Sequence, residues 1–286
     1  MRKFCEKLMG GVFLIAALTS IVAVAFICIF LFANGLPAIM KIGPLKFLLG
    51  TKWAPNNVPA LYGIFPMILG SIYVTAGAII IGVPIGILTS VYLSKYCGKG
   101  AYKVLKPATE LLAGIPSIVY GFFGMVVLVP LVKMIFGGNG NSILTASILL
   151  GIMILPTIIG VAESALRSVP ESYYEGALAL GATKERSIFS VMLPAAKSGI
   201  MAAVVLGIGR AIGETMAVIM IAGNQPRITG DITKGIRTLT ANIVLEMGYA
   251  QDLHREALIA NGVVLFVFIL IINLSFSALK RGKDGK

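Results

Sequence analysis

The sequence predicts an all-α integral membrane protein with six transmembrane helices. Two compositional observations lead to this prediction: 57% of the 286 residues are hydrophobic and only 13% are charged, with a mean hydropathy of +0.94. A soluble domain normally carries about 25% charged residues, and its core could not bury this much apolar surface. The third observation is that six apolar runs reach the roughly 20 residues that a helix needs to cross a bilayer.

The six runs are separated by segments that hold most of the charged residues. A signal peptide is the alternative for the first run, but its apolar stretch would cover about 7–15 residues before a small-residue cleavage site. The run in this chain is longer, so we expect a retained helix. In order, the expected helices cover Leu8–Ala33, Met67–Leu93, Pro107–Phe136, Ile143–Leu166, Gly199–Ala222 and Glu256–Leu279.

The lysine and arginine residues between the runs predict which side of the membrane each segment faces. With the N-terminus inside, 15 of the 24 fall in inside segments and 8 in longer outside segments, and the remaining one is Arg210. Both termini are therefore expected to be cytoplasmic. The expected organisation is a first helix in 1–34, an external loop in 35–66, a core domain of five helices in 67–280 with a cytoplasmic loop in 167–197, and a cytoplasmic tail in 281–286.

The composition argues against nucleic-acid binding and against catalysis. The net charge is +12, but the basic residues lie in loops rather than in a patch interleaved with aromatics, so membrane topology explains them better. No GxxxxGK[ST] phosphate loop occurs, and the three cysteines and one histidine lack metal-site spacing. We therefore expect no catalytic residue, metal or cofactor, and we interpret His254 as a solvated surface residue.

The two long outside segments are expected to differ in character. Segment 35–66 contains several prolines and therefore cannot be a single helix. Its Trp53 is interpreted as an interfacial anchor rather than a platform for a ligand. Segment 223–255 is polar and of mixed charge, so we expect it to be exposed and available to an external partner.

Small residues and one proline indicate special contacts of the helices. Gly82–Gly86 and Gly209–Gly213 have GxxxG spacing, which lets helix backbones approach closely, and packing within the chain is favoured over homodimerisation. Pro116 interrupts the hydrogen-bond ladder of the third expected helix, and Ser117 could bond a freed backbone group. A simple kink and a kink that faces a central cavity are equally compatible with this pattern.

The inside segment 167–197 has the pattern of two short helices outside the bilayer. An early proline and two early glutamates favour a first helix over Val169–Leu180, and Gly181 ends it. A second helix, from about Thr183 to Met192, is expected to stop before Pro194. The apolar residues of these helices suit insertion into a groove on another protein.

This segment resembles the cytoplasmic EAA loop of ABC importer permeases. That pattern has Glu-Ala-Ala, a glycine six positions after the glutamate, and Leu-Pro at its end, and a small glycine replaces the first alanine in this chain. The resemblance implies a type I importer permease fold, in which the loop docks on a separate ATPase subunit and transmits its closure to the membrane helices. The residues of the expected coupling loop are Glu175, Gly176, Ala177, Gly181, Leu193 and Pro194.

Four further stretches carry a likeness to a narrower family: Phe47–Pro55, Tyr62–Ile64, Gly114–Gly121 and Gly209–Ala217. With them, nearly the whole chain is similar to the phosphate-specific transport permease family, C subunit. It implies a permease subunit of an ATP-driven importer of inorganic phosphate in the cytoplasmic (inner) membrane of a bacterium or archaeon. The implied partners are a second, A-type permease subunit, two ATPase subunits and an external phosphate-binding protein.

Arg210 and Glu214 are charged residues within the fifth apolar run. Such residues cost about 2.5–3.5 kcal/mol each at membrane depth, so they should face the protein interior, and their spacing predicts one shared helix face. A guanidinium suits phosphate, and the resemblance implies that the pair matters for transport. We therefore favour a weak contact with phosphate in transit, with a purely structural ion pair as the alternative. Glu163 and Glu110 are interpreted as snorkelling or capping residues.

Three other functions remain open at this point. A permease for sulfate, molybdate or another oxyanion would carry the same motifs. An ion-coupled secondary transporter would need carboxylates at mid-membrane and no ATPase, and Glu214 alone would supply them. A membrane scaffold without transport would have the same helices but would not stimulate an ATPase.

Overall fold

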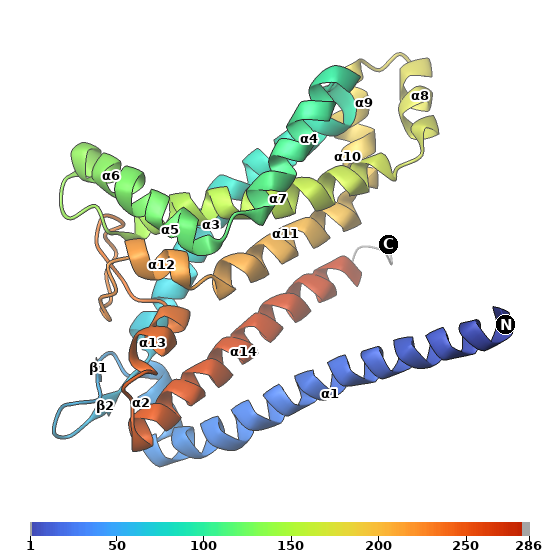
Figure 1. Cartoon of the computed structure of the whole chain (residues 1–286). Coiled ribbons are helices and arrows are strands. Elements are labelled where there is room, and N and C mark those ends of the chain that lie inside the picture. The colour runs from blue at the N-terminus through green and yellow to red at the C-terminus, as the bar shows by residue number, and fades with distance from the viewer. Residues whose placement is uncertain (1, 282–286) are drawn as a thin grey trace.

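The computed structural model describes residues 2–281, and the side chains of residues 9–275. The chain is built almost entirely of helices (Figure 1). Within the described residues, five helices are long and apolar enough to cross a membrane, and a helix pair bent by 71° gives a sixth span when it is counted as one. The all-α membrane fold predicted from composition is therefore confirmed. Residues 282–286 of the expected cytoplasmic tail lie outside the described residues.

Helices α1 (Arg2–Ile42) and α14 (Asp252–Arg281) lie side by side at one edge of the molecule (Figure 1). A Cβ atom on Gly35 would lie only 3.1 Å from the Cα atom of Ala260 in α14, so the two backbones approach closely here. Helix α1 extends past its expected end at Ala33. The side chain of Asn34 does not stop it, because its amide donates a hydrogen bond to the Phe30 carbonyl within the helix (2.8 Å).

The segment after α1 folds into a short helix and a small hairpin. Helix α2 (Pro44–Leu49) buries Phe47, and β1 (Trp53–Ala54) pairs antiparallel with β2 (Leu61–Tyr62). Trp53 is only 7% exposed, and its indole N–H donates to the Glu246 carboxylate (2.8 Å). The interpretation of Trp53 as an interfacial anchor is therefore wrong: the indole is held inside the protein by a polar partner that lies far away in the sequence.

Helices α3 (Phe65–Val91) and α7 (Ile143–Arg167) form the centre of the core, and α11 (Lys197–Gly213) packs on α7. A Cβ atom on Gly82 would lie 2.7 Å from Cγ1 of Ile154, and the carbonyl oxygen of Gly151 would be 2.8 Å away. The Gly82–Gly86 spacing thus serves packing within the chain, as expected. The glycines at 209 and 213 instead face open space within the described chain.

The third expected helix is divided into two helices. After a π-helical turn, η1 (Tyr92–Tyr96), helix α4 (Lys99–Gly114) buries no residue, and extended backbone at Ile115 and Pro116 separates it from α5 (Ser117–Phe123). A second π-helical turn, η2 (Gly124–Leu128), leads into α6 (Val129–Phe136). The membrane span is therefore 117–136, and α4 is a separate amphipathic helix.

The second half of the chain contains a projecting segment and another broken span. Helix α8 (Glu171–Ala179) stands out at one end of the molecule, opposite the β1–β2 hairpin (Figure 1). We call these two ends of the molecule the α8 end and the hairpin end. The sequence predicts that the α8 end is cytoplasmic. The other elements are α9 (Lys184–Ser187), η3 (Ile188–Met192), α10 (Leu193–Ala195), α12 (Met216–Ile221) and α13 (Leu239–Glu246).

The contact between α3 and α7 generates a stability prediction. Gly82→Val inserts a side chain where Ile154 and a backbone oxygen leave no room, so we expect the free energy of unfolding to fall by about 1–3 kcal/mol. Gly209→Val is the matched control, because it makes the same change in a helix where nothing lies within 4 Å. Thermal unfolding of the purified chain measures both, and equal melting temperatures for the two variants would contradict the prediction.

Candidate translocation and coupling sites

Arg210 lies on α11, close to the middle of the helix bundle. Its Nη1 atom donates to the hydroxyl of Thr157 (3.3 Å), which lies near the centre of α7. The side chain is half-buried, and its one hydrogen-bond partner within the described residues is neutral. A permanently charged guanidinium is therefore held at membrane depth by a weak contact, which leaves donors free for an anion.

Glu214 does not share a helix face with Arg210. Helix α11 ends at Gly213, and Glu214 has extended backbone angles (φ −68°, ψ 129°). Its carboxylate turns toward the next helix and accepts hydrogen bonds from the N–H groups of Thr215 (3.1 Å) and Ala217 (3.3 Å). The alternative of an intrahelical ion pair is therefore wrong, because the helix stops one residue before Glu214 and the carboxylate caps α12 instead.

Two helix breaks lie against each other, one before α5 at 115–116 and one between α11 and α12 at 214–215. A Cβ atom on Gly121 of α5 would lie 3.0 Å from the Cα of Ala217 in α12. Pro116 lacks the N–H group that would bond the Leu112 carbonyl in a continuous helix. The Tyr120 hydroxyl donates a hydrogen bond to that carbonyl instead (2.9 Å). Ser117, the residue we expected in this role, makes no such bond in the described chain.

The backbone freed at the second break also has a partner. The carbonyl of Glu214 accepts a hydrogen bond from the Thr240 hydroxyl of α13 (3.1 Å). Non-helical backbone at membrane depth is tolerated where it lies inside protein or lines a polar cavity. The paired breaks, with Arg210 one turn away, are therefore the strongest candidate for the wall of a translocation pathway.

The expected coupling loop folds as two short helical segments joined at Gly181. The N–H of Ala182 bonds the Ala177 carbonyl (3.0 Å) and the N–H of Gly181 bonds the Leu178 carbonyl (2.9 Å), which is the Schellman arrangement. Gly181 has a φ of +84°, which a residue with a Cβ atom adopts only at a cost. Glu175 and Gly176 are exposed on α8.

An exposed apolar tip projects from this loop. Leu180, beside Gly181, is 92% exposed. Behind it the loop is firmly attached, since Ile188 and Met192 are fully buried against the core. A movement of the tip would therefore be passed directly to the membrane helices.

The second segment of the loop does not stop before Pro194. A π-helical turn, in which the Leu193 N–H bonds the Ile188 carbonyl, carries the helix through Leu193 and Pro194 to Ala195. The wider turn removes the clash that a proline makes with the carbonyl four residues earlier. The same device occurs before Pro130, after η2.

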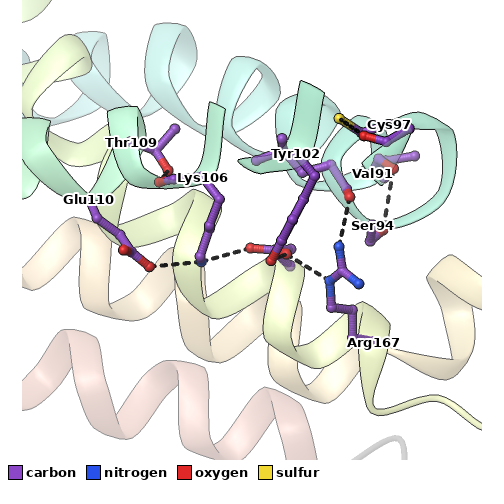
Figure 2. A network of polar contacts seen from close by, with 11 residues as sticks. Val91, Ser94, Cys97, Tyr102, Lys106, Thr109, Glu110 and Arg167 are labelled. Atoms are coloured by element: carbon purple, nitrogen blue, oxygen red, sulfur yellow. Dashed lines mark hydrogen bonds and ion pairs between the residues drawn. The ribbon is translucent and has the colours of Figure 1, made fainter. Parts of the chain in front are cut away.

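A buried carboxylate joins α4 to α7 near the α8 end, and it was not expected from the sequence. Glu163 is 2% exposed and accepts hydrogen bonds from Lys106 (2.8 Å), the Tyr102 hydroxyl (2.7 Å) and Arg167 (2.7 Å). Figure 2 shows these three side chains converging. Snorkelling and capping are both wrong for Glu163, because its carboxylate is enclosed between two cations.

The network extends to neighbouring groups and keeps Lys106 charged. Arg167 also donates to the Leu93 carbonyl (3.0 Å), and Glu110 approaches Lys106 at 3.6 Å (Figure 2). The hydrogen bond from Lys106 to Glu163 raises the pKa of Lys106, and the same carboxylate raises the pKa of Tyr102 by accepting its hydroxyl hydrogen bond. Lys106 is therefore ionised at every physiological pH.

A second buried carboxylate organises the hairpin end. Glu246 of α13 accepts hydrogen bonds from Trp53, Arg237 (2.5 Å) and the His254 ring (2.9 Å). His254 is 9% exposed, so its interpretation as a solvated surface residue is wrong. Segment 223–255 is likewise not simply exposed, because Glu246 ties it to the hairpin and to α14.

Among the residues that the structure describes, no group of three His, Cys, Asp or Glu side chains could hold a metal ion.

Comparison with known proteins identifies relatives along most of the chain. The family model described as binding-protein-dependent transport system inner membrane component matches residues 82–284. The probable ABC transporter permease protein YqgH of Bacillus subtilis is 40% identical and covers 92% of this chain and 88% of its own length. The phosphate transport system permease protein PstC of Mesorhizobium japonicum is 34% identical and covers 90% of this chain and 84% of its own length.

Solved structures of ABC transporters share the fold. A bacterial alginate ABC transporter in complex with an alginate-bound periplasmic protein matches with a TM-score of 0.63 and 17% identity over 94% of each chain. An inward-facing MetNI methionine ABC transporter matches with a TM-score of 0.56 and 20% identity over 84% of this chain and 98% of its own. At these identities the likeness concerns the fold alone.

The Glu163 network generates a second stability prediction. Glu163→Gln removes the negative charge between Lys106 and Arg167, and we expect a loss of about 1–3 kcal/mol, less than the ~3–5 kcal/mol of a fully buried pair because both cations reach solvent. Glu110→Gln is the control, since that carboxylate is 65% exposed and should change stability by less than about 0.5 kcal/mol. Thermal unfolding compares them, and a Glu163→Gln protein as stable as the control would refute the assignment.

Proposed function

The chain belongs to the family of binding-protein-dependent transport system inner membrane components, and from this premise we propose that it is the permease subunit of an ATP-driven importer of inorganic phosphate. One observation carries the proposal. Several relatives that are 30–34% identical over at least 90% of the chain share the name phosphate transport system permease protein PstC. The chain is accordingly a transport subunit, located in the inner membrane as a multi-pass protein.

The geometry around Arg210 supports an anionic cargo. The guanidinium has a neutral partner, Thr157, and lies one turn from a break between half-helices. Planar guanidinium donors match a phosphate oxygen pair. Because the contact is a single residue in a half-buried position, we infer a weak, transient interaction that allows release.

The coupling loop supports ATP hydrolysis on separate subunits. We infer that two ATPase subunits, a second permease subunit of the A type and an external phosphate-binding protein complete the importer. Closure of the ATPase subunits would displace the Leu180 tip, and the buried Ile188 and Met192 would transmit the displacement to α11. The helices would then rock between inward-open and outward-open states.

Labelled-phosphate uptake into reconstituted vesicles tests the proposed cargo. The assembled complex, with ATP on the ATPase side and the binding protein on the other, should accumulate phosphate only while ATP is hydrolysed. Excess unlabelled phosphate should abolish the uptake of label, whereas sulfate and molybdate should leave it unchanged. Equal competition by sulfate or molybdate would replace phosphate with a broader oxyanion class, and uptake without ATP would refute an ATP-driven importer.

Arg210 provides a site-specific prediction. Arg210→Ala should reduce phosphate uptake at least about tenfold, because about 1.4 kcal/mol of lost transition-state contact corresponds to a factor of ten, while the complex stays assembled. Thr157→Val removes only the partner of Arg210 and should keep most of the uptake. If both variants lost uptake equally, Arg210 would act by holding α7 and not by contacting the cargo.

Gly181 provides a prediction on coupling. Gly181→Ala places a Cβ atom at a φ of +84°, which costs about 1–2 kcal/mol and should shift the end of α8. We expect several-fold less phosphate transported per ATP hydrolysed. The control, Gly100→Ala, lies on the exposed side of α4, outside the coupling loop, with nothing within 4 Å, and should transport normally. Unchanged coupling in Gly181→Ala would show that the tip geometry is not needed.

A further inference from the structure

A polar cavity lies beneath the coupling loop, at the α8 end and away from the candidate pathway. Its volume is about 320 Å³, and it is formed where η1, the end of α7, α8 and the start of α9 meet. Figure 2 shows Ser94 and Arg167, which line one side of it. The complete lining consists of Ser94, Lys95, Arg167, Glu171, Tyr174 and Lys184.

The cavity contains more positive than negative charge. Three cations, Lys95, Arg167 and Lys184, line the cavity beside a single carboxylate, Glu171. Lys95 is paired with Glu171 and Arg167 with Glu163 behind the lining, which leaves the charge of Lys184 unpaired among the described residues. The side chain of Lys95 is 11% exposed, whereas that of Glu171 is 58% exposed. The exposed end of this ion pair therefore contributes little to stability, and a bound anion can replace it.

The cations are held in place by aromatic rings and not by carboxylates alone. The ammonium of Lys184 lies 4.5 Å from the ring centre of Tyr96, and that of Lys95 lies 5.7 Å from the ring of Tyr174. Lys184 has no carboxylate partner within the described residues. Arg167 uses Nε and Nη2 on Glu163 and Leu93, and its Nη1 has no acceptor in the described chain.

We propose that this cavity binds a phosphate group on the cytoplasmic side, independently of the cargo pathway. Lys184, Lys95 and Nη1 of Arg167 are the donors, and Tyr174 in the lining offers a further hydroxyl, whereas the Ser94 hydroxyl donates to the Val91 carbonyl (3.2 Å). The volume corresponds to about ten water molecules at roughly 30 Å³ each, enough for a phosphate group with part of its hydration. The ligand is free inorganic phosphate or the headgroup of an anionic lipid.

Occupancy of this site acts on the coupling loop. Lys95 belongs to η1, and Glu171 is the first residue of α8, so their ion pair (2.8 Å) links the two elements directly. A phosphate group that takes Lys95 releases Glu171, so that the anion links η1 to Lys184 of α9 in place of the ion pair between η1 and α8. The site therefore makes the coupling loop responsive to phosphate groups on the side where the cargo arrives.

Binding of radiolabelled inorganic phosphate tests this inference on the whole complex in lipid nanodiscs. All variants also carry Arg210→Ala, so that phosphate bound in the proposed pathway does not contribute to the signal. The external binding protein is omitted for the same reason. In nanodiscs of phosphatidylcholine we expect saturable binding. Lys184→Gln should weaken it about tenfold, as expected for one lost charge-assisted hydrogen bond, and Lys184→Arg should retain it. Lys99→Gln, an exposed lysine outside the cavity, should have no effect.

A second arm separates the two sources of the phosphate group. If a lipid headgroup is the natural ligand, adding phosphatidylglycerol to the nanodiscs displaces the labelled phosphate. If free phosphate is the natural ligand, the binding of labelled phosphate stays unchanged. The site is refuted if no saturable binding occurs in phosphatidylcholine, or if Lys184→Gln binds as tightly as the unsubstituted protein. It is also refuted if Lys184→Gln loses the ATPase subunit, because the cations would then hold an acidic protein surface.

Discussion

The structure depends above all on the satisfaction of backbone polar groups at membrane depth. Lipid offers no hydrogen bonds, so each break in a helix must supply its own partners. At the first break the Tyr120 hydroxyl serves the Leu112 carbonyl. At the second, the Glu214 carboxylate serves two N–H groups and Thr240 serves the Glu214 carbonyl. These partners allow the helical chain to be interrupted at two neighbouring places without leaving the freed backbone groups unbonded.

Buried carboxylates fix the two ends of the bundle around these breaks. Glu163 joins α4 to α7 at the α8 end, and Glu246 joins the hairpin, α13 and α14 at the other. Losing one partner of an ion pair that is enclosed by protein destabilises the fold strongly. Each cluster therefore favours one arrangement of its helices. Each also ties together elements that lie far apart in the sequence, one cluster at each end of the bundle.

Composition and local patterns predict much of the fold, whereas contacts between distant residues escape them. The apolar runs predict the helices because lipid requires them, and Gly181 predicts the end of α8 because its positive φ is a local property. Two of the three partners of Glu163, Lys106 and Tyr102, lie 57 and 61 residues away, and Trp53 lies 193 residues from Glu246. No local pattern signals those pairs. The break at Glu214 was missed because no proline marks it, although a glutamate after a glycine in an apolar run could have suggested it.

The separation of Arg210 from Glu214 has a chemical consequence for transport. On a continuous helix the two charges would neutralise each other, and an arriving anion would have to displace a carboxylate. The break turns Glu214 toward the N–H groups of α12 and leaves Arg210 beside the neutral Thr157. The negative charge is thereby used to stabilise the break, and under the proposed function the positive charge remains available to the passing oxyanion. One interruption of the helix thus both creates the discontinuity in the span and exposes its cation.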